Sequence, residues 1–116
     1  MSLESNLFDA LKGLVSNRVY PDVAPYGAAL PHITYQQIGG RAINFLESGV
    51  PGKRNARVQI NVWATTRTAA ATLSRQAEEA LITSANLKAF VLSAAYARFD
   101  LDVQQYGTNQ DFSIWF

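Results

Sequence analysis

Two segments of the chain carry apolar residues at the spacing of an amphipathic helix. Apolar positions three and four residues apart predict one helix over about residues 3–15, with Ser2 as its N-cap. A second helix is expected to begin after a threonine cap at 65, 66 or 68 and to end near Ser84. The apolar stripes are Leu3, Leu7, Leu11 and Leu14 in the first helix and Ala70, Leu73, Ala77 and Leu81 in the second. The alanines of the second stripe indicate close packing on a sheet.

Elsewhere the apolar and polar residues alternate, which predicts strands. We expect these strands at residues 19–20, 33–38, 41–47, 55–64, 94–104 and 112–116. Two turns join neighbouring strands in this scheme, one at Gly39-Gly40, where both glycines accept a positive φ, and one at 107–109. Residues 84–93 follow neither spacing, so we interpret them as a connection.

Strand 55–64 shows what the sheet should look like. One side of this strand is apolar and the other is polar apart from a tryptophan, with Ala56, Val58, Ile60 and Val62 opposite Arg57, Gln59, Asn61 and Trp63. In 94–104 we expect Ala95, Ala97, Phe99, Leu101 and Val103 to share one face. The pattern predicts an α+β fold in one domain spanning residues 1–116: a single, mainly antiparallel, twisted sheet of five or six strands with two helices packed on one face.

The composition excludes several classes of protein. Of 116 residues, 48% are apolar and 16% charged, which is typical of a globular chain with a buried core. There is no cysteine, which excludes disulfides and thiolate catalysis. A net charge of +1 argues against duplex binding. No secretory signal and no membrane-spanning apolar run is found, so we expect synthesis in a cytoplasm and no membrane partner.

The candidate catalytic residues are few. His32 is the sole histidine and has no nucleophile beside it, so we interpret it as a partly exposed residue at a strand edge. Asp100 and Asp102 share a strand face and could share a proton or hold a cation, as a small hydrolase would require. A solvated acidic face interleaved with Arg98 explains them better. We therefore predict no enzyme activity, no metal site and no cofactor.

Basic and aromatic residues leave two interpretations open. Lys53, Arg54 and Arg57 form a small cluster that is either ordinary solvated charge or a contact for an acidic protein or nucleic acid. The aromatic residues that could stack on bases, or simply pack, are Tyr96, Tyr106, Phe112 and Trp115. The alternative function is accordingly a small nucleic-acid-binding α+β module that uses an aromatic sheet face. Trp63 is typical of a packing residue or an interface anchor.

Four stretches resemble the tail completion family of long-tailed bacteriophages and prophages, which includes tail-to-head joining and tail terminator proteins. They are RVYP at 18–21, APYGAALPHITYQQI at 24–38, ARVQINVWA at 56–64 and DFSIWF at 111–116. The opening SLESNLFDALKG is also in the style of this family, so the resemblance spans nearly the whole chain.

The resemblance implies a structural subunit without catalysis. Such a subunit would form a ring, expected to be a hexamer, in solution or only on the tail tip. It would cap the head-proximal end of the tail tube and join the tail to the head connector, with DNA only passing through the lumen. Its partners would be other copies of itself, the tail tube protein and the head–tail connector protein. The implied location is the head–tail junction of the virion, after synthesis in the cytoplasm of a bacterial host.

The resemblance also suggests where the contacts lie. Long loops of such subunits face the lumen or a neighbouring ring, so the candidate assembly-interface loop comprises Glu47, Gly49, Gly52, Lys53 and Arg54. The candidate interface on the sheet comprises Arg57, Gln59 and Trp63. The terminator and joining roles use the same style of subunit and are not distinguished at this stage.

Overall fold

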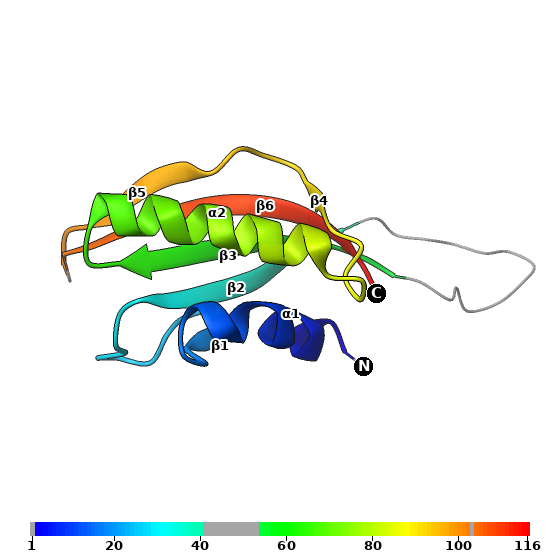
Figure 1. Ribbon diagram of the computed structural model, residues 1–116, viewed down its shortest axis with the longest axis horizontal. Helices are drawn as coiled ribbons and strands as arrows, with labels where there is room; N and C mark the ends of the chain where they lie inside the picture. The colour runs from blue at the N-terminus through cyan, green and yellow to red at the C-terminus, as the bar shows by residue number, and fades with distance from the viewer. Residues whose placement is uncertain (1, 41–53, 103) are drawn as a thin grey trace, which may run out of the picture.

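Six strands form one sheet in the computed structural model, which describes residues 2–40, 54–102 and 104–116. The strands are β1 (Val19–Pro21), β2 (His32–Gly39), β3 (Asn55–Ala64), β4 (Phe90–Val91), β5 (Tyr96–Asp100) and β6 (Gln105–Trp115). Their order is β1-β2-β3-β6-β4, and β5 also pairs with β6 (Figure 1). In the described part of the chain β1 runs parallel to β2, and the other pairs are antiparallel.

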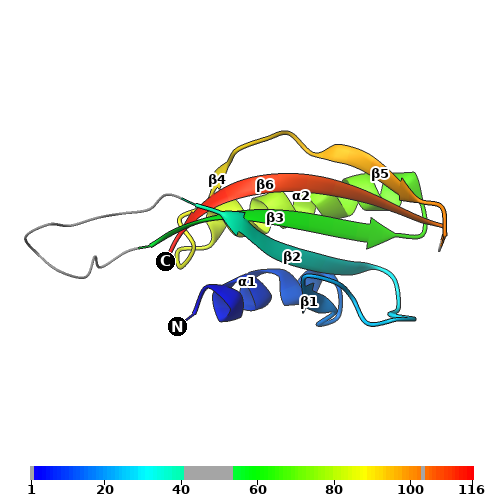
Figure 2. The same ribbon diagram turned by 180° about the vertical axis from the view of Figure 1, so that it is seen from behind.

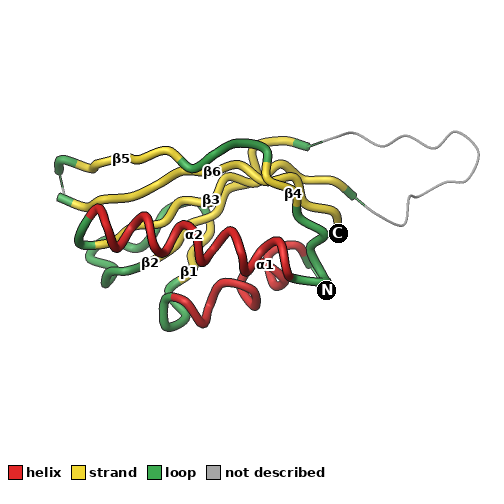
Figure 3. The backbone as a smooth tube through the Cα atoms, turned by 45° about the horizontal axis from the view of Figure 1, so that its top comes forward, coloured by secondary structure: helices red, strands yellow, loops and turns green. Residues whose placement is uncertain are grey.

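Two α-helices pack on the same face of this sheet (Figure 3). Helix α1 (Leu3–Leu11) continues into a short 3-10 helix, η1 (Lys12–Leu14), and α2 is Arg67–Thr83. Both α-helices begin at the predicted caps: the Ser5 backbone N–H donates to Ser2 Oγ and the Ala69 N–H to Thr66 Oγ1, each at 3.1 Å. The predicted α+β class, the mainly antiparallel sheet and the placement of the helices on one face are confirmed.

The core lies between the helices and the apolar face of the sheet. All four residues predicted on the apolar side of β3 are at most 2% exposed. They meet Leu3, Leu7 and Leu11 of α1 and Leu73, Ala77 and Leu81 of α2, together with Phe112 and Ile114 from β6. The two helical spacings and the strand alternation therefore place their apolar residues in a single cluster. Of the described helices, none is long and apolar enough to cross a membrane.

The predicted turn at 107–109 is wrong, because these residues lie inside β6. Gly107 pairs with Trp63 of β3. A Cβ at this position would stand 2.6 Å from Trp63 Cε3 and 2.5 Å from the Val62 carbonyl oxygen. The glycine is therefore explained by a close approach of the indole ring and the neighbouring strand, and not by a turn.

The last hairpin differs from the prediction in its bounds. The expected strand 94–104 is shorter in the structure, because β5 ends at Asp100 and β6 begins at Gln105. Residues 84–93 are not merely a connection, since Phe90 and Val91 form β4 against Ser113 and Phe112 of β6. The predicted strand at 41–47, and with it the far side of the Gly39-Gly40 turn, lies outside the described residues.

Candidate assembly surfaces

Figure 2 shows the face of the sheet that points away from α2. The three sheet residues predicted to form an interface alternate with the buried residues Ala56, Val58, Ile60 and Val62 of β3, so they lie on this face. Because cross-strand partners share a face, the outward residues of β3 lie beside those of β6. Arg57 is opposite Ser113, Gln59 opposite Asp111, and Trp63 opposite Gly107. We call Arg57, Gln59, Trp63 and Asp111 the polar face. The structure brings the predicted residues onto one surface, spread along β3.

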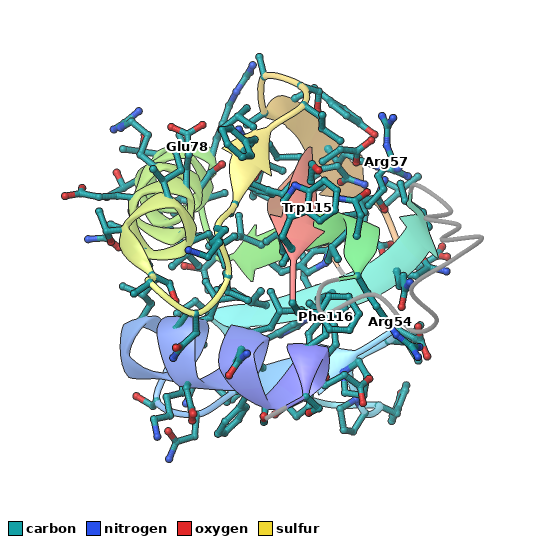
Figure 4. All side chains as sticks on the ribbon, turned by 90° about the vertical axis from the view of Figure 1, so that its right-hand side faces the viewer. Arg54, Arg57, Glu78, Trp115 and Phe116 are labelled. Atoms are coloured by element: carbon teal, nitrogen blue, oxygen red, sulfur yellow. The ribbon has the colours of Figure 1, made fainter. Side chains whose placement is uncertain are left out.

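Arg57 is held in position by an ion pair across the two strands. Its Nη2 and Nε donate to Asp111 Oδ2 at 2.8 and 3.3 Å. The Arg57 side chain remains 48% exposed, so the guanidinium is still accessible to a partner. Figure 4 shows Arg57 on the side of the sheet away from α2, which carries Glu78. An exposed pair of this kind contributes at most about 1 kcal/mol to stability, so it orients Arg57 more than it stabilises the fold.

Trp63 is partly committed to packing within the chain. Its ring covers Gly107, and the residue is half-buried. Its cross-strand neighbour on the other side is His32, which is 4% exposed. An indole held in this way offers one edge to a partner without losing side-chain freedom on binding.

The structure corrects the prediction for His32, which is buried and not partly exposed. Its Nδ1 lies 3.2 Å from the carbonyl oxygen of Ala29, and the Tyr20 ring approaches edge-on with centroids 6.0 Å apart. Burial lowers the pKa of His32, with the hydrogen bond to the Ala29 carbonyl opposing this effect. The neutral imidazole therefore has a structural role at the start of β2.

Of the candidate interface loop, only Arg54 is among the described residues; Glu47, Gly49, Gly52 and Lys53 lie outside them. Arg54 is exposed and exchanges two backbone hydrogen bonds with Phe116, at 2.7 and 2.9 Å. Figure 4 shows the two residues near each other. Arg54 is thus fixed beside the end of β6, directly before β3 begins.

A second surface was not predicted from the sequence. The outer border of the sheet, formed by β4, β5 and the residues that follow each strand, exposes a row of large apolar side chains that we call the apolar edge. It consists of Phe90, Val91, Leu92, Tyr96, Phe99 and Leu101. The alternation at 94–104 puts Phe99 and Leu101 on one face without saying what covers it, and in the structure α2 packs on β3 and β6 and leaves β5 exposed. The apolar run at 90–92 was the available sequence signal.

The alternatives based on carboxylates and on aromatic stacking gain no support from the geometry. Asp100 Oδ1 accepts the Asp102 backbone N–H at 3.0 Å, which is a local turn contact. No three acidic or histidine side chains of the described residues gather as metal ligands. Phe112 is 1% exposed in the core, so it cannot join Tyr96, Tyr106 and Trp115 in one base-stacking surface.

Known proteins resemble this chain in fold and in sequence. Solved structures share the fold: a chain from the virion of a native gene transfer agent particle has 16% identity and a TM-score of 0.55, covering 98% of this chain and 93% of that one. The gp17 protein of bacteriophage SPP1 has 18% identity and a TM-score of 0.54, covering 96% and 83%. Among curated proteins, none matches significantly. The sequence profile of the tail completion protein gp17 family matches residues 7–116, and the chain belongs to that family.

Proposed function

We propose that this protein is a non-catalytic structural subunit that completes the tail of a phage or prophage particle. It forms a ring, expected to be a hexamer, that caps the head-proximal end of the tail tube and joins it to the head connector. The family match over residues 7–116 carries this proposal. Support for assembly comes from the apolar edge, because an exposed row of large apolar side chains on a sheet border is typical of an interaction site.

A ring requires two different surfaces on each subunit, because its contacts run head to tail. The apolar edge and the polar face are two such surfaces, formed by different strands. In the proposed ring, the apolar edge of one subunit is buried against its neighbour. The polar face supplies charged and amide groups, with Arg57 oriented by Asp111 and Trp63 held over Gly107.

The candidate loop is proposed to face the head connector or the lumen. Its described end, Arg54, is exposed and anchored to Phe116 through the backbone. A cation at this position would attract an acidic partner surface or the DNA that passes through the lumen.

Electron microscopy of particles made without this gene tests the proposal and separates its two roles. Overlong tail tubes would indicate a terminator that stops polymerisation. Tails of normal length beside unattached, filled heads would indicate a joining protein. Intact, infectious virions would contradict both roles.

A further inference from the structure

A groove of about 500 Å³ runs between the first half of α2 and β5. It exists because α2 packs on β3 and β6 and does not reach β5, so every residue of β5 retains some exposure. The groove lies on the helix side of the sheet and is distinct from the polar face. Of the apolar edge, it includes Phe99 alone.

The lining of the groove is mainly apolar and largely composed of small side chains. Alanines form its two walls: Ala70 and Ala71 of α2 on one side, and Ala97 of β5 with Ala95 just before that strand on the other. Phe99 and Tyr106 lie at one end with ring centroids 4.8 Å apart and planes tilted by 53°. Phe99 is 48% exposed and Tyr106 37% exposed. Alanine walls leave room for a bulky apolar side chain, which the two rings would contact.

Two arginines of α2 flank this apolar lining, and the lining contains no acidic residue. They are Arg67 and Arg75. Arg98 of β5 also borders the groove, but it pairs with Gly107 in the same row as Trp63, so its side chain belongs to the other side of the sheet. Within the described residues, the ion pairs join Lys12 to Asp9 and Arg57 to Asp111, so neither Arg67 nor Arg75 forms an ion pair there. The groove therefore combines apolar walls with two arginines that form no ion pair, and their positive charge attracts an anionic ligand.

The position of Arg67 strengthens this field. Arg67 is the first residue of α2, and the first turn of the helix contains no acidic residue. The helix dipole is positive at this end and favours anions, so a cation here is unfavourable for the isolated helix. A carboxylate bound in the groove would relieve this repulsion and would accept paired hydrogen bonds from a guanidinium.

The spacing of the charges suits an extended peptide. Arg67 and Arg75 are eight residues apart on α2, which corresponds to about 12 Å along the helix axis. An extended chain covers that distance in about four residues. Carboxylates at the two ends of such a segment would meet the two arginines, and an apolar side chain between them would point at the alanine walls.

We propose that this groove binds an extended segment of a partner protein in which acidic residues flank a bulky apolar side chain. A peptide is favoured over nucleic acid because the walls are apolar and the net charge of the chain is only +1. This site goes beyond the proposed ring, since the polar face lies on the other side of the sheet and the groove shares only Phe99 with the apolar edge.

Selection from a ribosome-display library of random short peptides on the purified full-length protein tests this proposal. The enriched sequences are expected to contain at least two Asp or Glu around one Leu, Phe or Trp. A fluorescently labelled enriched peptide then gives a dissociation constant by anisotropy. Arg67→Glu with Arg75→Glu should weaken binding by about tenfold or more, because charge-assisted contacts become repulsive. Ala71→Phe should weaken it by filling the groove.

The matched control is Lys12→Glu with Lys88→Glu, which changes the net charge equally at exposed positions outside the groove. This control should leave the dissociation constant within about twofold at moderate salt, because distant charges are screened. Circular dichroism melting confirms that each variant is folded. Enriched peptides without acidic residues, or an affinity that the groove variants leave unchanged, would overturn the proposal. So would saturable binding of oligothymidylate that the double arginine variant abolishes, because that result would identify a nucleic-acid site.

Discussion

Replacing Gly107 by alanine tests how closely β6 packs against β3. The added Cβ would lie 2.5 Å from the Val62 carbonyl oxygen and 2.6 Å from Trp63 Cε3. Val62 pairs with Thr108 of β6 and Ile33 of β2, so its carbonyl cannot withdraw without disturbing both strand pairs. Overpacking a tight site costs about 1–3 kcal/mol, and we expect the upper half of this range, about 2–3 kcal/mol, because the obstacle is backbone.

For a chain of this size, 1 kcal/mol corresponds to about 4 °C in the melting midpoint. Gly107→Ala should therefore lower the midpoint by about 8–12 °C. The measurement is thermal and urea denaturation at one fixed protein concentration, since any self-association makes the midpoint depend on concentration. An unchanged urea m-value would show that the substitution lowers the free energy of unfolding without changing the compactness of the folded or unfolded state.

The matched control is Gly13→Ala. Gly13 lies in η1, and a Cβ there would meet nothing within 4 Å. Alanine should leave the midpoint unchanged or raise it, because glycine loses more backbone entropy on folding. If Gly107→Ala melts with the wild-type midpoint, the strand can shift to accept a Cβ, and the close packing of Trp63 over this glycine would not be the reason for its presence.

Three further predictions concern assembly and pH. Phe90→Ser with Leu92→Ser should change the free energy of unfolding by at most about 1 kcal/mol, because both side chains are exposed. The same variant should sharply reduce plaque formation when it is supplied to a phage that lacks this gene. Full complementation would contradict a role for the apolar edge. Lys53→Glu with Arg54→Glu should also reduce complementation without lowering the melting midpoint, and undiminished assembly would remove these two residues from the docking role. His32 has a lowered pKa in the folded state, so the unfolded chain takes up the proton first as the pH falls. The contribution of His32 to stability is therefore present above about pH 6.5 and is lost as the pH falls through the pKa of the folded state. His32→Gln should flatten that part of the plot of urea midpoint against pH, whereas an unchanged slope would assign the pH dependence to other groups.

The helices and strands in which apolar residues recur at a regular spacing were predictable from sequence. The alternation at 55–64 places β3 within its observed bounds, and the leucine and alanine stripes locate both α-helices. These predictions succeed because each residue's side of the element follows from local geometry alone. The polar-face residues Arg57, Gln59 and Trp63 follow from the same rule.

Features that depend on distant segments were not predictable. Gly107 has two readings in sequence, a turn or a close approach, and only the presence of Trp63 on the neighbouring strand decides between them. The alternation around Phe99 gives its side of β5 but not whether a helix covers that side. Strand β4 has two residues and exists only because β6 pairs with it. Accordingly, the apolar edge and the groove beside α2 become visible only once the layers are assembled.

The position of β6 has a consequence for how the subunit is made. β6 lies between β3 on one side and β4 and β5 on the other, yet it follows all of them in the chain. During translation, β3, β4 and β5 are therefore synthesised before β6, the strand with which all three pair. A chain that terminates before β6 would leave β4 and β5 without a partner, would expose the edge of β3 and would lack Phe112 and Ile114 in the core, so proteases and chaperones would have access to it. We expect cells to degrade such fragments, so that incomplete copies do not compete with complete subunits for places in a particle.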